Sequence, residues 1–419
     1  MLKRSVTRAY RIFSRNSATY AERKTGLNYE FDKEDRNLRH EIHAFTKEVV
    51  IPLAPFYDQT SQFPLRVIEA AHEAGILNAS IPREYGGKNF DLMEKVLISE
   101  EIAYGCAAMA SAIAINDFAE TPLIIAGSEA LKRKFLGRMT EEPLVAAYAV
   151  TEADAGSDVA GIQMKCEKKG NEYVLNGTKT WVNNAGPASW FYVLCRSDPD
   201  PQTPISKAFT AFVVDGDTHG VSKGSKELTM GVRACDIRTV NFEEVRVPEE
   251  NVVGKPGDGF VITMKMFDKT RAEVAAIATG LISRCVDEAG KYALERKTFG
   301  VPIADHQAVK AMLADMAIDL ELARLITYRS AWEWMTGRPR GYFSSIAKCF
   351  CADVANTVAA NSVQIFGGNG FNQSYPMEKL LRDSKALQIF EGTSQIQRTI
   401  IARDLLRRFK DTTTFVIDT

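Results

Sequence analysis

The chain has 419 residues, of which 45% are hydrophobic and 25% are charged, and its 52 basic side chains nearly balance its 53 acidic ones. This composition is ordinary for a globular protein with a sizeable core, and the balanced charge gives no reason to expect a nucleic-acid partner. No run of about 18 consecutive apolar residues occurs, so we expect no membrane span.

The first twenty residues differ from the rest of the chain. Five basic residues and no acidic one lie between Met1 and Tyr20, and apolar residues recur among them at roughly helical spacing. This pattern is typical of a mitochondrial transit peptide, which we assign to residues 1–25. A disordered basic arm is the alternative. The expected location is the mitochondrial matrix.

The next region, residues 30–145, has a helical pattern. Leu38, Ile42, Phe45 and Val49 recur every three to four residues, and we expect Pro52 to end that helix. Similar spacing continues beyond it, so we predict an N-terminal helical domain.

Residues 146–255 change to short β-like runs. Tyr173–Leu175 and Thr178–Val182 flank Asn176–Gly177, which predicts a hairpin with its turn at the Asn-Gly pair. The runs follow one another without intervening helices, which favours a middle domain built on an antiparallel sheet or small barrel.

Residues 256–411 are helical again. We predict a long helix over about 259–296, and Val309, Leu313, Met316, Leu320 and Ala323 line one face of another. Long apolar stripes with few turns between them indicate a C-terminal helix bundle, so the whole chain is predicted to be an α+β protein. The last residues, 412–419, show no pattern.

Few residues point to metal chemistry. The seven cysteines contain no Cys-x-x-Cys pair and the five histidines form no ligand-spaced set, so we expect no metal. Thiols scattered in this way suit a reducing compartment, where they act as small core residues.

Four segments carry groups that could do chemistry, although each has a plainer interpretation. The segment Tyr148 to Asp158 offers hydroxyls and a glycine that lets backbone approach a ligand, but it could be a simple turn. Trp181 could stack on a flat cofactor, although a core position is commoner. Arg296 with Thr298 could hold a phosphate or merely end a helix. Glu391 precedes a capping position, where a carboxylate is usually solvated.

Taken together and in this order, the segments resemble the acyl-CoA dehydrogenase family over residues 30–410. The segment 149–161 is similar to the first signature of that family. Most of the second is present in the segment 364–371, with Lys379 and Asp383 downstream. Segments 100–106, 138–144 and 267–271 are most similar to the medium-chain members.

The resemblance implies a helical–β–helical fold whose C-terminal domain is a four-helix bundle. It also implies an FAD cofactor, an acyl-CoA substrate, an electron-transferring flavoprotein as partner and a homotetramer. The positions where the family binds FAD are here Tyr148, Val150, Thr151, Gly156, Ser157, Trp181, Val182, Asn183, Arg296, Thr298, His306, Gln307, Gln364, Ile365, Phe366, Gly367, Gly368, Thr393, Ser394 and Gln395. Those from 296 to 368 would reach FAD at a subunit interface. The positions where the family touches acyl-CoA are Ser157, Asp268, Lys269, Thr270, Arg271, Gly392 and Arg403.

By the same resemblance, Glu391 occupies the position of the catalytic base. It would take a proton from Cα of the thioester while Cβ delivers a hydride to the flavin. One subgroup places its base near residue 270 instead. Since that residue is Thr270 here, straight-chain substrates are favoured over the isovaleryl type.

The chain departs from the family at several positions. Ala153 and Asp154 replace a common Pro and Gly, Asn183 replaces a hydroxyl residue beside the flavin, and Ser374 replaces an acid. Ala110 and Ala114 stand where medium-chain relatives carry larger polar residues on the helix that lines the acyl pocket. Small residues there would deepen the pocket, so we expect medium to somewhat longer chains.

Two other functions share this fold. An oxidase would pass electrons to oxygen, but such enzymes are usually longer and peroxisomal. A non-catalytic scaffold that binds acyl-CoA or FAD is the second alternative, and it would have no need of a base at Glu391.

Overall fold

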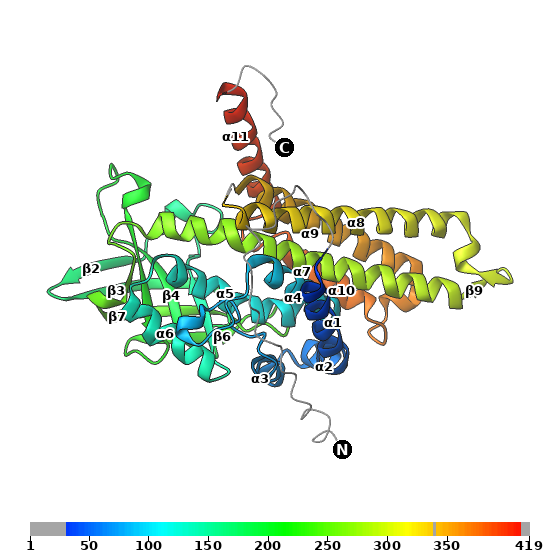
Figure 1. The fold of residues 1–419 in the computed structure, drawn as a ribbon, viewed down its shortest axis with the longest axis horizontal. Coiled ribbons are helices and arrows are strands. Elements are labelled where there is room, and N and C mark those ends of the chain that lie inside the picture. The colour runs from blue at the N-terminus through cyan, green and yellow to red at the C-terminus, as the bar shows by residue number, and fades with distance from the viewer. Residues whose placement is uncertain (1–30, 338–340, 412–419) are drawn as a thin grey trace.

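The computed structural model describes residues 31–337 and 341–411. The assigned transit peptide and the C-terminal tail therefore lie outside the described residues. Three regions follow one another, with helices at each end of the chain and a sheet in the middle, as Figure 1 shows. The predicted fold class is confirmed.

Helices form the N-terminal region: α1 (Lys33–Phe45), a π-helix (Thr46–Val50), α2 (Ile51–Thr60), α3 (Leu65–Glu73), α4 (Leu92–Gly105), α5 (Ala107–Ala126) and α6 (Glu129–Glu141). The prediction that Pro52 ends a helix is wrong. Pro52 lies in the first turn of α2, where its missing N–H costs little, and the wide π-turn before it joins α1 to α2.

Helix α5 is long and apolar enough to cross a membrane by length and composition, although 89% of its apolar window is buried inside the protein. A core helix of a globular protein passes the same test, and the helices and strands packed around α5 account for its composition.

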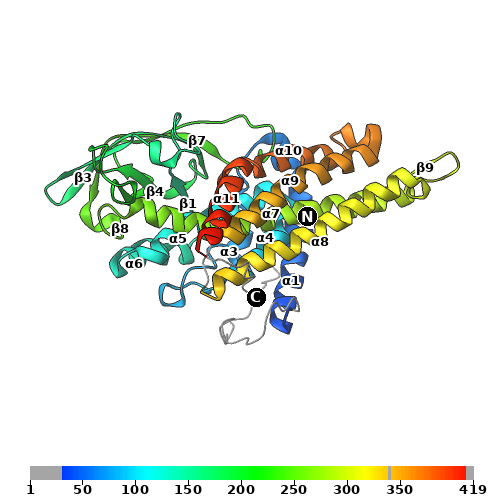
Figure 2. The same cartoon turned by 90° about the horizontal axis from the view of Figure 1, so that it is seen from above.

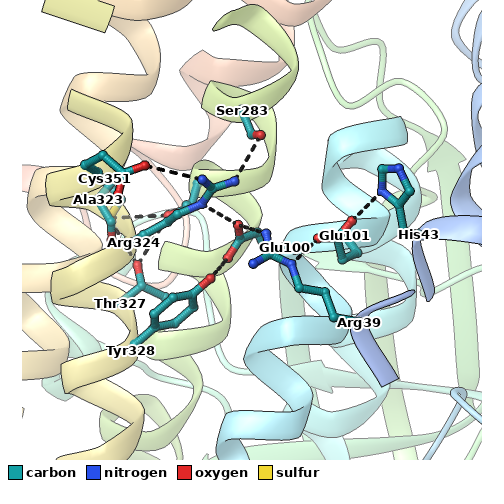
Figure 3. A network of polar contacts seen from close by, with 12 residues as sticks. Arg39, His43, Glu100, Glu101, Ser283, Ala323, Arg324, Thr327, Tyr328 and Cys351 are labelled. Carbon is teal, nitrogen blue, oxygen red and sulfur yellow. Dashed lines mark hydrogen bonds and ion pairs between the residues drawn. The ribbon is translucent and has the colours of Figure 1, made fainter. Parts of the chain in front are cut away.

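A polar network ties these helices to the C-terminal bundle (Figure 3). The carboxylate of Glu100 in α4 accepts hydrogen bonds from Arg39, Arg324 and Tyr328, at 3.2, 2.9 and 2.6 Å. Each of its oxygens is thus paired, as a buried carboxylate requires.

The middle region is one eight-stranded sheet. Its strands are β1 (Val145–Ala149), β2 (Lys165–Lys169), β3 (Glu172–Asn183), β4 (Ala188–Arg196), β5 (Phe209–Asp215), β6 (Val221–Lys226), β7 (Ile237–Pro248) and β8 (Val252–Val253). The order is β6-β7-β3-β2-β4-β5-β8, with β1 beside β4. Most pairs are antiparallel, as predicted, but β1 runs parallel to β4 and one parallel bridge joins β2 to β4.

The prediction of a hairpin turn at Asn176–Gly177 is wrong. β3 runs straight through these residues, and its partner β7 accommodates them with a register shift between Leu175 and Gly177. The hairpin turn lies earlier, between β2 and β3, at Gly170 with φ +67°. A glycine inside a strand marks an irregularity as readily as a turn.

The C-terminal region contains α7 (Gly259–Glu295), α8 (Gln307–Met335), α9 (Gly341–Phe366), α10 (Met377–Leu387) and α11 (Ser394–Asp411), with a small hairpin of β9 (Lys297–Thr298) and β10 (Val301–Pro302). Short 3-10 turns occur at Arg83–Tyr85, Val159–Gly161, Ile205–Lys207, Glu249–Asn251, Ile303–Asp305 and Gly367–Phe371. The long helix predicted over 259–296 is confirmed.

Helix α7 is the central helix of the molecule. It packs against α4, α5, α8 and α9, so that one apolar core joins the N-terminal helices to the bundle. In both views the sheet lies toward one end of the molecule, and the β9 hairpin forms the other end (Figures 1 and 2).

Candidate active site

Glu391 lies in the short loop between α10 and α11, and its side chain is buried, with 5% of its surface exposed. The interpretation of this residue as a solvated charge at a helix start is therefore wrong. Its φ of +56° is unusual for a residue with a side chain. Such backbone strain is often retained where a side chain must point into a functional site.

Two hydroxyls hold the carboxylate of Glu391. The Tyr148 hydroxyl, from β1, donates to Oε1 at 2.5 Å, and the Thr270 hydroxyl, from α7, donates to Oε2 at 2.9 Å. Burial raises the pKa of Glu391, while these two hydrogen bonds and the nearby Arg271 and Lys348 oppose the rise. A buried carboxyl with a raised pKa is suited to accept a proton.

The loop that carries Glu391 is fixed from behind. Lys348 of α9 donates to the carbonyl of Gly392 at 2.6 Å, and Gln397 of α11 donates to the carbonyls of Glu391 and Gly392 at 3.0 and 3.1 Å. Burial lowers the pKa of Lys348 to about 8. Thr393 caps α11 by accepting from the N–H of Ile396 at 3.2 Å.

Sequence reasoning missed Lys348 and Gln397 as parts of this site. Lys348 lies on the apolar-patterned helix α9, where no local motif distinguishes it from other buried polar residues. Gln397 lies six residues after Glu391, and a glutamine on the buried side of the first turn of a helix was the only available signal.

A second polar group lies on α7 beside the base. The Arg271 guanidinium donates to Asp268 Oδ1 at 2.8 Å and lies 3.4 Å from the Ser345 hydroxyl. Its Nε is buried and has no hydrogen-bond partner among the described residues. Lys269 reaches the Thr121 hydroxyl at 3.4 Å. Of the other predicted acyl-CoA residues, Ser157 is exposed, and Arg403 contacts Asp404 at 3.4 Å.

The loop after β1 is held close to β3 and open on its other side. Lys179 donates to the carbonyl of Val150 at 3.0 Å and to Glu152 at 2.8 Å, and the Thr180 N–H donates to the carbonyl of Thr151. A side chain at Gly156 would meet nothing within 4 Å. The loop is therefore tied to β3 by hydrogen bonds, and its open side can let a ligand approach the backbone at Gly156.

Trp181 is 62% exposed and has a φ of +57°, so the interpretation of it as a core residue is wrong. Val182 beside it is buried, and the Asn183 side chain accepts from the N–H of Asn184 at 2.8 Å. An exposed indole on a bulged strand, at the end of the sheet that carries Tyr148, offers a face on which a flat ring could stack.

The remaining residues predicted to bind FAD lie at the opposite end of the bundle. Thr298 and His306 are hydrogen-bonded at 2.8 Å beside the β9 hairpin, with Arg296 and Gln307 next to them. The segment 364–368 ends α9 there, where Phe366 stacks on Tyr292 at 4.0 Å. About 38 Å of α7 separates this end from Thr270. The predicted residues therefore form two groups that one subunit does not bring together.

The chemistry open to the first group is proton abstraction next to a flat redox cofactor. The buried base, the exposed indole, the open glycine and the unpaired Arg271 nitrogen suit a flavin and a polar substrate group. Among the residues that the structure describes, no group of three or more potential ligands could hold a metal. All seven cysteines are buried and unbridged.

Three family descriptions match consecutive parts of the chain: "Acyl-CoA dehydrogenase, N-terminal domain" over residues 32–143, "middle domain" over 147–245 and "C-terminal domain" over 257–406. The "Probable medium-chain specific acyl-CoA dehydrogenase 2, mitochondrial" of Caenorhabditis briggsae is 50% identical over 380 residues, which cover 91% of this chain and 92% of that protein.

Two solved structures are similar over most of their length. Butyryl-CoA dehydrogenase from Megasphaera elsdenii has a TM-score of 0.87 at 31% identity, and the match covers 91% of this chain and 100% of that one. A chain in the structure described as the electron transferring flavoprotein of Acidaminococcus fermentans has a TM-score of 0.88 at 32% identity, with the same coverage of both.

Proposed function

The chain belongs to the acyl-CoA dehydrogenase family, and from that premise we propose that it oxidises straight-chain, medium-chain acyl-CoA to trans-2-enoyl-CoA in mitochondrial β-oxidation. It is a flavin-dependent dehydrogenase, and FAD is its cofactor. The observation that carries the proposed reaction is the buried, doubly hydrogen-bonded carboxylate of Glu391.

Glu391 removes the proton from Cα of the thioester. Each pKa unit of mismatch between this weak carbon acid and its base costs about 1.4 kcal/mol, so burial that raises the pKa of Glu391 assists the transfer. Tyr148 and Thr270 orient the carboxylate while it is charged. Lys348 and Gln397 fix the loop behind it, which keeps the backbone N–H of Glu391 available to the thioester oxygen.

FAD, when bound, supplies the acceptor for the hydride from Cβ. We propose that Tyr148, Val150, Thr151, Gly156, Ser157 and Trp181 to Asn183 bind it from the sheet, and that Thr393 to Gln395 bind it from the start of α11. Ser157, Asp268 to Arg271, Gly392 and Arg403 would contact the acyl-CoA. The open backbone at Gly156 and the exposed Trp181 support this assignment.

A homotetramer would unite the two groups of FAD residues. The far end of the bundle carries exposed apolar side chains, among them Phe299 at 96% exposure, Leu294 and Phe371. On α8, Ile318, Leu322 and Leu325 add an exposed apolar stripe at helical spacing. Such surface normally marks an interface, and a partner subunit placed there would bring Arg296, Thr298, His306, Gln307 and 364–368 to a neighbouring FAD.

Straight-chain substrates are supported by Thr270, which leaves Glu391 as the base. The medium-chain preference is supported by the identity to the nematode protein. We propose the mitochondrial matrix as location on the same ground. An electron-transferring flavoprotein is the proposed acceptor, since one similar chain comes from a structure described by that name.

The test is anaerobic mixing of the purified holoenzyme with saturated acyl-CoAs from C4 to C16, while the visible absorbance of the flavin is followed. We expect bleaching in the wild type and a loss of at least about a hundredfold in rate for Glu391→Gln. Glu167→Gln on the exposed face of β2 is the matched control. A holoenzyme that binds acyl-CoA yet never bleaches would be the scaffold, and rapid peroxide production in air would identify an oxidase.

A further inference from the structure

A cluster of charged side chains lies where α4, α5 and α7 meet. It contains the buried Lys95 of α4, Asp117 and Glu120 of α5 and Glu273 of α7, with the half-buried Lys269 of α7 beside them. Lys95 Nζ lies 2.5 Å from Asp117 Oδ2, and both side chains are inaccessible to solvent. The other two acids of the cluster, Glu120 and Glu273, have no ion-pair partner of this kind among the described residues.

Glu120 and Glu273 are wholly buried, and neither oxygen of either carboxyl has a hydrogen-bond partner among the described residues. Glu100, five residues after Lys95 on α4, is also buried, but both of its oxygens are hydrogen-bonded (Figure 3). Burial and the negative Asp117 raise the pKa of Glu273 to about 8, and the same two causes raise the pKa of Glu120. Glu273 therefore holds a proton at neutral pH.

The cluster adjoins the catalytic carboxylate. Thr270, which donates to Glu391, lies one helical turn before Glu273 on α7. Phe118, between Asp117 and Glu120 in sequence, packs against Tyr148, with ring centroids 6.3 Å apart. The charges of Glu391 and Glu273 repel each other, and this repulsion contributes to the raised pKa of Glu273.

The groups that face Glu273 come from four places. Lys95 faces it from α4, Asp117 and Glu120 from α5, Lys269 from its own helix and Glu391 from the loop before α11. On the other helices packed against α7, Arg324 of α8 pairs with Glu100, Lys348 of α9 with the carbonyl of Gly392, and Lys379 of α10 with Asp383. Glu273 is thus a titratable residue of this cluster that lies one helical turn from Thr270, the residue that donates to the base.

We propose that Glu273 is a positioning residue whose loss of a proton makes Glu391 a stronger base. The inference rests on the proposed function, in which Glu391 takes the α-proton. A negative charge on Glu273 destabilises the carboxylate form of Glu391 and so favours its protonation. The proton is only partly transferred in the transition state, so only part of the increase in the proton affinity of Glu391 lowers the barrier. The rate of flavin reduction should therefore rise by about threefold as pH passes through the ionisation of Glu273.

The experiment compares wild-type holoenzyme with Glu273→Gln between pH 5 and 9.5, by two measurements. The first is the rate of flavin bleaching with a saturating medium-chain acyl-CoA under anaerobic conditions. The second is the melting temperature. Glu120→Gln is the matched control, because it changes an equally buried acid of the same cluster.

The sign of the second measurement follows from the raised pKa of Glu273. The folded protein holds this proton more tightly than the unfolded chain does, so the wild type loses stability as pH rises from the ordinary glutamate range to about 8. Glu273→Gln cannot ionise, and its melting temperature should fall less over the same range.

Support requires that Glu273→Gln lacks the alkaline rise in rate and loses less stability than the wild type between about pH 5 and 8, while Glu120→Gln keeps the alkaline rise in rate. An unchanged rate profile in Glu273→Gln, or an equal change in Glu120→Gln, would overturn the inference. If Glu273→Gln does not fold, Lys269→Gln serves instead. It removes a positive neighbour and should move the alkaline step to higher pH, and no movement would count against the proposal. Failure of the wild type to bleach at any pH would refute the proposed function instead.

Discussion

The hydroxyl of Tyr148 and the carboxylate of Glu391 lie 2.5 Å apart although 243 residues separate them in sequence. This hydrogen bond stabilises the charged form of Glu391 and opposes the effect of burial. Tyr148→Phe should therefore raise the pKa of Glu391. The acid limb of the rate of flavin reduction should move up by about one pH unit, since a hydrogen bond to a charged group contributes roughly 1.5–3 kcal/mol.

Stopped-flow bleaching between pH 5 and 9 measures this limb. Tyr173→Phe, another tyrosine buried in the sheet region, is the control and should leave the limb in place. A Tyr148→Phe limb that stays at the wild-type pH would show that the hydroxyl does not act on the base.

Ala110 and Ala114 lie one turn apart on α5, and both are buried. If they line the acyl pocket, Ala114→Leu should shorten the preferred chain. Each methylene that loses its place should cost about 0.8 kcal/mol, or about fourfold in kcat/KM. The ratio of dodecanoyl-CoA to octanoyl-CoA activity measures the effect. Ala112→Leu is the control. Ala112 lies on another side of α5, where its backbone carbonyl accepts a hydrogen bond from Asn184. Equal losses for both substrates would place Ala114 outside the pocket.

The two groups of predicted FAD residues allow a test by mixing subunits. Glu391→Gln removes the base. Arg296→Ala weakens FAD binding by the residues near the β9 hairpin, here called the far group. Each variant alone should therefore be nearly inactive. If the far group binds the FAD of the neighbouring subunit, a pair made of one subunit of each variant contains one site with both defects and one intact site. Random mixing should then restore roughly one quarter of the wild-type sites.

The measurement is the activity of the two variants after co-expression, compared with the same proteins purified separately and then combined without exchange. If both groups acted on one FAD within a subunit, each subunit would still carry a defect and co-expression would restore nothing. Restoration therefore reports directly on the proposed assembly.

Lys348 gives a prediction on stability. Burial lowers its pKa to about 8, so the folded protein binds this proton less tightly than the unfolded chain between about pH 8 and 10.5. Stability of the wild type relative to Lys348→Met should rise over that range, by no more than about 3 kcal/mol. Denaturant unfolding at pH 7, 8.5 and 10 measures the difference, with Lys165→Met at the exposed start of β2 as the control. A difference independent of pH would contradict the burial of a charged Lys348.

The helices and the order of the three regions could be predicted because their signals are local. Apolar spacing indicated α7 and α8, and the absence of helical spacing indicated the sheet. The turn at Asn176–Gly177 was mistaken because the same dipeptide can bulge a continuous strand when its partner, β7, extends past it. Local pattern does not report the length of a partner strand.

The site was harder to predict from local sequence. The burial of Glu391 depends on Tyr148 and Thr270, which lie far from it along the chain, so only the family resemblance indicated its role. Trp181 is exposed and has a positive φ, and no residue type near it signals either feature. The cluster around Glu273 likewise has no local pattern, since its acids come from separate helices.

The positive φ of Glu391 places function and stability in opposition. A glycine would adopt this conformation without strain and would remove a buried carboxyl, so Glu391→Gly should fold at least as stably as the wild type. Selection for stability alone would therefore tend to erase the glutamate. A lineage that keeps Glu391 does so against that tendency, whereas a duplicated copy released from catalysis would be expected to drift first at this position.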